Sequence, residues 1–132
     1  MLQESYDLYA SLADNIPNWK NIDKNELINK YIEYEKTDHT LANYYMGAIM
    51  CKYWPKIYRF YKATPLVCTY EDVYDWLTES IVKTLEHKTW LNPDHKLYGD
   101  PKGPDKCINI RMKSCRLNYL IAVNRDKKFF SV

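Results

Sequence analysis

The chain has 132 residues, of which 46% are hydrophobic and 27% are charged, and its formal net charge is +2. This length suits one domain with a buried core, and the composition excludes an intrinsically disordered chain. No apolar run approaches the roughly 20 residues of a membrane-spanning helix, and the acidic first ten residues are unlike a secretory signal, so a soluble intracellular protein is expected.

The charges are distributed unevenly along the chain. Residues 1–40 hold 8 acidic and 4 basic side chains, and residues 41–105 hold 8 of each. Residues 106–132 hold 7 basic side chains and one acidic one, a net charge of +6. Such segregation steers an anionic partner toward the C-terminal segment without identifying that partner.

Residues 1–22 start with apolar side chains spaced three and four apart, and Pro17 interrupts the pattern. This segment is either a short helix that docks on the domain or an arm that docks on another molecule. Residues 23–132 are expected to form a single helical domain. Helical periodicity continues nearly throughout, and no sustained strand alternation occurs. The predicted fold is therefore all-α, a small bundle of about four to five helices.

Three helix starts are signalled in the middle of the chain. Asp23, with Glu26 as a capping-box partner, opens a helix that runs to about Lys36. A new cap within residues 37–40 precedes a helical stretch over residues 41–63, which Pro55 must kink or divide. Thr69 caps a third helix, which carries acidic side chains in its first turn and a lysine in its last, as the helix dipole favours.

The stretch 41–63 holds more aromatic side chains than one buried face accommodates, so some are expected at the surface or against a partner. They are Tyr44, Tyr45, Tyr53, Trp54, Tyr58, Phe60 and Tyr61. After the third helix comes an irregular loop, predicted over residues 89–105, with several prolines and glycines. Loops this long are often functional.

The last predicted helix contains the stretch "INIRMKSCRLNYLIAVNRDKK". Ile108, Met112 and Tyr119 follow the spacing of a buried stripe, whereas Arg111 and Arg125 lie on another strip. We therefore expect a core-packing helix with a basic outer face. The plain alternative is the solvated face of an ordinary bundle helix. The lack of acidic side chains one turn from the bases favours a nucleic-acid partner.

The sequence carries no motif of a known catalytic or nucleotide-binding site, so a non-enzymatic protein without cofactor or metal is expected. The four cysteines form no CxxC pair, and a composite site of Cys68 with His87 and His95 is the one metal-binding set left open. Asp94, Asp100 and Asp105 are the only acids suited to a metal-dependent nuclease near the basic helix.

Two stretches are similar to the second conserved region of bacterial and phage sigma factors. Residues 69–85 resemble the part in which "EDL(V)Q" opens a helix. Residues 108–128 resemble the next part, in which an asparagine and an arginine are separated by six residues and followed by further bases. Asn118 and Arg125 keep that spacing here. The resemblance covers about 90 residues and rests on short motifs.

The resemblance implies a sigma-like helical domain that binds the RNA polymerase core and promoter DNA in a bacterial or infected bacterial cytoplasm. The contact with the clamp helices of the beta-prime subunit would come from Glu71, Asp72, Asp75 and Trp76. The contact with DNA near the −10 element would come from Arg111, Lys113, Arg116, Asn118, Arg125, Lys127 and Lys128.

The chain also departs from the sigma pattern. Asp75 stands where the family often has glutamine, Arg111 stands where a tryptophan is common in the smaller members, and the aromatic ladder that captures melted bases is missing. Strand opening is therefore not expected. The alternative function is a small phage structural or assembly protein that acts through its surplus aromatic side chains. A plain helix-turn-helix protein is less well supported, because no compact motif with a short glycine-containing turn occurs.

Overall fold

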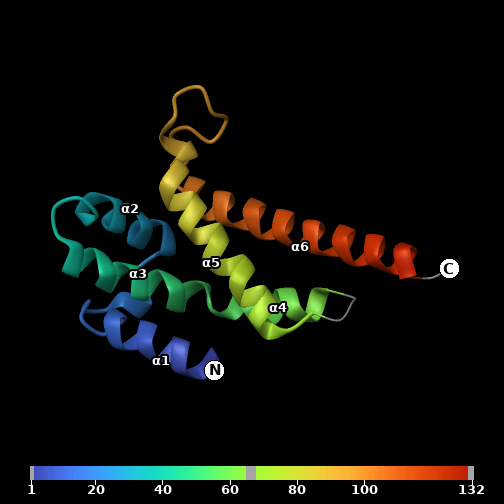
Figure 1. Cartoon of the computed structure of the whole chain (residues 1–132). Coiled ribbons are helices and arrows are strands. Elements are labelled where there is room, and N and C mark those ends of the chain that lie inside the picture. Colours follow the sequence, from blue (N-terminus) through green and yellow to red (C-terminus); the bar gives the residue numbers. More distant parts are fainter. Residues whose placement is uncertain (1, 65–67, 131–132) are drawn as a thin grey trace.

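The computed structural model describes residues 2–64 and 68–130, with side chains as far as Arg125. All regular structure in these residues is helical, which confirms the predicted all-α bundle (Figure 1). The α-helices are α1 (Leu2–Ala13), α2 (Lys24–Tyr34), α3 (His39–Tyr53), α4 (Pro55–Ala63), α5 (Tyr70–His87) and α6 (Gly103–Phe130). Short 3-10 helices span Trp19–Asn21 and Thr89–Leu91. Within the described part of the chain, no helix combines the length and the apolarity needed to cross a bilayer.

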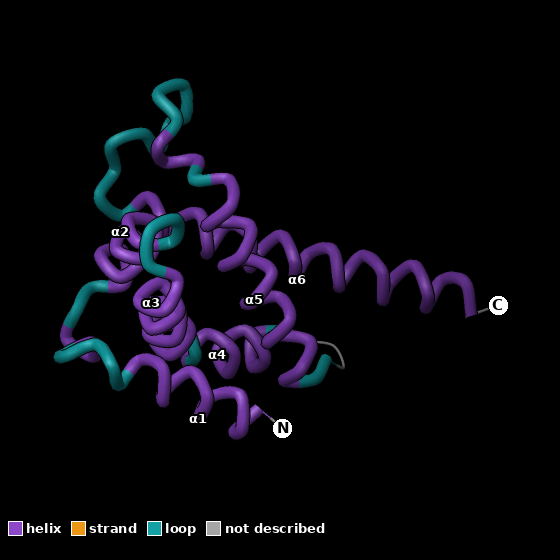
Figure 2. Tube along the Cα trace, turned by 60° about the vertical axis from the view of Figure 1, so that its left-hand side comes forward, coloured by secondary structure: helices purple, strands orange, loops and turns teal. Residues whose placement is uncertain are grey.

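Helix α3 lies at the centre of one half of the molecule, with α1 and α2 packed on different sides of it (Figure 2). Helix α1 approaches closely because Gly47 of α3 has no side chain. A Cβ at this position would lie 2.6 Å from the backbone oxygen of Tyr9. Ala13, Ile16 and Trp19 are buried in the same core. The first 22 residues therefore contribute a docked helix and core side chains.

Pro55 divides the predicted 41–63 stretch into two helices. It is the first residue of α4, where its missing N–H is not needed. Trp54, at the junction, packs against Tyr6 of α1 and Tyr74 of α5, with ring centroids 5.4 and 5.5 Å apart. Tyr58 is 53% exposed, so the prediction that some of these aromatic side chains lie at the surface is confirmed.

Helix α5 begins with the predicted cap. The Thr69 hydroxyl accepts a hydrogen bond from the Asp72 backbone N–H at 3.1 Å, and the Asp72 carboxylate accepts one from the Thr69 N–H at 2.9 Å. The apolar stripe of α5 then packs on α4 and α6. Figure 1 shows α6 starting near the end of α5, running back along it and projecting beyond the bundle.

The predicted irregular loop is shorter than expected, because Thr89–Leu91 is helical and α6 begins at Gly103. Lys88 ends α5 in the left-handed conformation and pairs with Glu35 at the end of α2. Trp90 and Leu97 are buried. The loop is thus anchored at both ends and borders α5 and α6.

Asp105, in the first turn of α6, joins three helices through polar contacts. Its carboxylate accepts a hydrogen bond from the Tyr53 hydroxyl at 2.7 Å and pairs with Lys24 at 3.2 Å. Its backbone N–H donates to the side-chain oxygen of Asn25 at 2.9 Å. Because Tyr53 is only 1% exposed, burial, followed by the Asp105 hydrogen bond, raises its pKa above the ordinary value.

Candidate functional site

The bases of α6 lie on two flanks of the helix. At about 100° per residue, side chains seven positions apart share a face, so Arg111 and Arg125 share one flank with Asn118. Lys113 and Arg116 lie on the other flank, toward α4. The Arg116 guanidinium there sits 5.3 Å from the ring centroid of Phe60. The predicted DNA-contact residues are therefore divided between two surfaces.

The centre of the outer face of α6 is apolar. Ile110, Leu117 and Ile121 are 51%, 57% and 54% exposed. We call these three residues the α6 apolar ridge. The expectation of a basic outer face was thus wrong in its detail, because the bases flank this ridge. These outward positions hold isoleucine and leucine side chains that are more than half exposed.

Two bases of α4 join those on the adjacent flank of α6. Lys56 lies close enough to Arg59 and Lys113 for their charges to act on it. Burial lowers the pKa of the Lys56 ammonium, and these two cations and Lys24 lower it further, against an opposing effect of Asp105. With Arg116 over Phe60, these side chains form one basic surface. We name it the α4–α6 basic patch, made of Lys56, Arg59, Lys113 and Arg116.

Lys56 and Arg59 are not among the DNA-contact residues predicted from the sequence. Their spacing of three residues places them on one face of α4, and that spacing was the available signal. Only the tertiary structure, which places Arg116 over Phe60 of α4, shows that this face adjoins Lys113.

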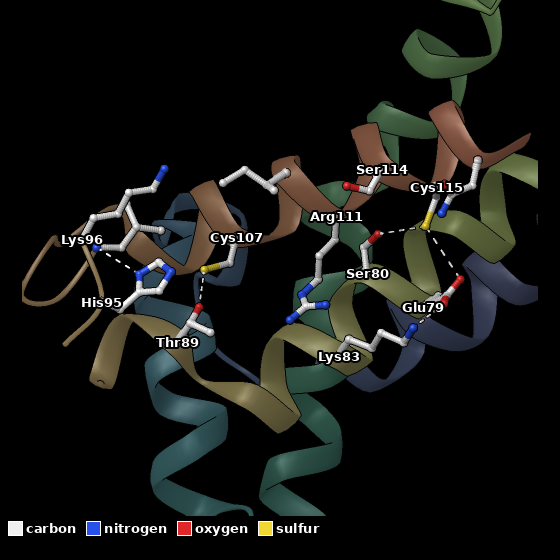
Figure 3. A pocket seen from close by; sticks show the side chains of 13 residues that line it. Glu79, Ser80, Lys83, Thr89, His95, Lys96, Cys107, Arg111, Ser114 and Cys115 are labelled. Carbon is white, nitrogen blue, oxygen red and sulfur yellow. Dashed lines mark hydrogen bonds and ion pairs between the residues drawn. The ribbon is translucent and has the colours of Figure 1, made fainter. Parts of the chain in front are cut away.

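On the other flank of α6, a cleft of about 450 Å³ opens between α5, α6 and the loop that joins them. Figure 3 shows Arg111 reaching from α6 into the space between the two helices. We name this space the α5–α6 cleft. Its lining residues are Glu79, Ser80, Lys83, Thr89, His95, Lys96, Leu97, Cys107, Ile110, Arg111, Ser114, Cys115 and Asn118.

The only acidic side chain of the cleft lining is already paired. Glu79 pairs with Lys83 at 2.7 Å, and this hydrogen bond holds the pKa of Glu79 below its ordinary value. The Cys115 thiol also points to Glu79, at 3.7 Å, and burial raises the pKa of that thiol. Arg111 has no hydrogen bond or ion pair with any described residue. Its charge acts on Glu79 and Lys83 only at longer range.

At the start of α5, the predicted polymerase-contact residues occupy different environments. Glu71 and Asp75 are exposed. Asp72 is held in the capping box. Trp76 is only 8% exposed and packs against Tyr119 of α6, with ring centroids 5.4 Å apart. The surface available to a partner is therefore acidic, and Trp76 supports it from within the core.

The remaining predicted candidates are not brought together. Cys68 precedes α5, whereas His87 and His95 lie at or beyond its end. An 18-residue helix separates its ends by about 27 Å at 1.5 Å per residue, so these three cannot share a metal ion. Asp100 pairs with Lys106.

Two further predicted DNA-contact residues, Lys127 and Lys128, have side chains outside the described part of the chain.

Comparison with models of known protein families, with curated proteins and with solved structures finds no match to this chain.

Proposed function

We propose that this protein is a non-enzymatic, sigma-like transcription module that binds the RNA polymerase core and promoter DNA. The observation that carries the proposal is that two exposed sets of opposite charge lie on different helices. An acidic surface, Glu71 and Asp75, lies on the first turns of α5. Basic side chains are gathered along α6, which projects beyond the bundle (Figure 1). The sequence resemblance assigns these same two helices to the polymerase and to DNA.

The DNA surface would be the α4–α6 basic patch, of which Arg59 and Lys113 are exposed. Lysine and arginine neutralise phosphates and release counterions, so the affinity depends steeply on salt. Four phosphate contacts would give a slope of about −3.6 in log K against log salt concentration. Arg111 points into the α5–α6 cleft and is therefore left out of this surface.

DNA binding is tested by fluorescence anisotropy with a labelled promoter duplex over a range of salt concentrations. The double variant Lys113→Glu/Arg116→Glu is expected to weaken binding by roughly 10²-fold or more and to lower the salt slope by about 2. The control Lys36→Glu/Lys102→Glu changes the charge equally at exposed positions away from the patch. Equal loss in both variants, or an affinity independent of salt, would refute a DNA surface at this place.

Polymerase binding is tested by pull-down with purified core enzyme. Glu71→Lys/Asp75→Lys reverses the exposed acids and leaves Asp72 in place, so that the cap of α5 is retained. Loss of polymerase from this variant is expected, while Glu26→Lys/Glu33→Lys, on α2, should bind like the native protein. Retained binding by the α5 variant would contradict the proposal.

A second function, assembly through protein–protein contacts, is favoured by the α6 apolar ridge. Exposed apolar side chains that line one face of a projecting helix are typical of interaction surfaces. If the chain associates with itself through this ridge, sedimentation should show oligomers that Leu117→Glu/Ile121→Glu dissociates. A native protein that stays monomeric at high concentration would exclude self-assembly through the ridge.

A further inference from the structure

We infer that the α5–α6 cleft is a binding site for a phosphate-bearing small molecule of up to nucleotide size, with Arg111 as the phosphate-binding residue. The cleft lies on the opposite flank of α6 from Lys113 and Arg116. It therefore differs from the proposed DNA surface in both position and lining, and the inference stands without the transcription function.

The charge of the cleft favours an anion. Lys83, Lys96 and Arg111 contribute three cations against the single carboxylate of Glu79. That carboxylate is already engaged by Lys83 at 2.7 Å. The two remaining cations have no acidic partner in the lining, so an entering anion gains their attraction without displacing an ion pair.

Arg111 has the geometry of an open phosphate ligand. It projects from α6 into the cleft between the labelled side chains of Lys83 and Cys107 (Figure 3). It is half-buried and forms no hydrogen bond with any described residue. A guanidinium carries five N–H donors in a planar fork that matches two phosphate oxygens. A bound phosphate would satisfy donors that the protein leaves unused.

Neutral donors also line the cleft. Ser114 and Asn118 lie about one and two turns along α6 from Arg111 and line the same cleft. At the loop end, the His95 Nδ1 accepts the Leu97 backbone N–H at 3.1 Å. This hydrogen bond places the ring proton of neutral His95 on Nε2, which is then a donor. The lining is thus rich in donors and poor in free acceptors, as phosphate oxygens require.

The size and the apolar part of the cleft indicate an ester rather than a bare ion. About 450 Å³ lies within the usual range of small-molecule sites, about 300–1,000 Å³, and far exceeds one phosphate group. Leu97 and Ile110 provide an apolar wall beside the polar groups. An organic moiety such as a nucleoside can cover the exposed surface of Ile110 while its phosphate reaches Arg111.

The inference is tested by calorimetric titration of the full chain with adenosine 5′-monophosphate and, separately, inorganic phosphate. Saturable binding is expected for both, tighter for the nucleotide. Arg111→Gln should weaken nucleotide binding at least about tenfold, and Arg111→Lys less, because it keeps the charge and loses the fork. Lys36→Gln removes the same charge from an exposed site elsewhere and should bind like the native protein.

A gain-of-binding variant separates this role from a purely structural one. Glu79→Gln removes the only carboxylate of the lining and frees Lys83, so it should bind the nucleotide several-fold more tightly. A misfolded variant would not gain affinity. Circular dichroism of each variant checks that the helices are retained.

Four outcomes would overturn the inference. The first is that the native protein shows no saturable binding at millimolar ligand, and the second is that Lys36→Gln and Arg111→Gln lose equal affinity for the nucleotide. The third is that Glu79→Gln gains no affinity. The fourth is that a dinucleoside phosphodiester binds as tightly as the nucleotide. The last result would mean that the cleft follows the backbone of a nucleic-acid strand. A small phosphorylated ligand is supported if the nucleotide binds more tightly than inorganic phosphate and than the phosphodiester.

Discussion

Replacing Asp105 with alanine is expected to be strongly destabilising, because one carboxylate joins α2, α3 and α6. The largest contribution comes from Tyr53. Its hydroxyl donates to Asp105 at 2.7 Å, and the residue is only 1% exposed. In Asp105→Ala this hydroxyl stays buried and loses its acceptor, which costs about 1–3 kcal/mol.

Two smaller losses add to this cost. The ion pair with Lys24 spans side chains that are 37% and 20% exposed, so solvent screening limits its contribution to about 0–1 kcal/mol. An acid in the first turn of α6 also stabilises the helix dipole by about 0.3–1 kcal/mol. The total of roughly 1–5 kcal/mol is a substantial fraction of the 5–15 kcal/mol that holds a typical domain folded.

Urea unfolding followed by far-UV circular dichroism measures this change as a shift of the midpoint at constant slope. The control Glu33→Ala breaks an exposed pair with Lys30 on α2 and should barely move the midpoint. Tyr53→Phe removes the hydroxyl itself, so Tyr53→Phe and Asp105→Ala should cost clearly less together than their sum. If Asp105→Ala unfolds at the same urea concentration as Glu33→Ala, or if the two costs simply add, the role assigned to this junction is refuted.

Three further predictions concern the core. Gly47→Ala should destabilise the fold by about 1–3 kcal/mol, because the added Cβ would clash with the Tyr9 backbone; urea unfolding measures this change. If the variant is instead about 1 kcal/mol more stable, as helix propensity alone predicts, the close α1–α3 contact is contradicted. Burial, and then the hydrogen bond with Tyr74, raises the pKa of Tyr9 from 10.0 to about 12. The unfolded chain therefore loses this proton first, so stability falls as the pH rises from 10 to 12, and Tyr9→Phe should flatten the decline measured by urea unfolding at several pH values. Burial also raises the pKa of Cys51 to about 11. An alkylating reagent should therefore modify the half-exposed Cys115 first and Cys51 only after unfolding, and mass spectrometry identifies the modified residue. Equal rates of alkylation of the two thiols in the native protein would contradict this.

The elements of this fold follow from signals that act over a few residues. Asp23 and Thr69 cap helices where the sequence predicts them, and Pro55 divides the long stretch before α4. Each of these effects depends on a backbone N–H within three residues of the side chain, so the local sequence is enough to locate it. The capping box of Asp23 with Glu26 is not what forms; the Asp23 carboxylate accepts from the Asn25 backbone N–H instead.

The arrangement of charge at the surface was decided by tertiary packing. Sequence alone identified the bases of α6 and the acids of α5, because helical spacing and charge are visible in it. It could not show that Arg111 points into a cleft, that Lys56 and Arg59 adjoin Lys113, or that Trp76 is buried. Each of these depends on how one helix is rotated and placed against another, and that is determined by core contacts between residues far apart in the chain.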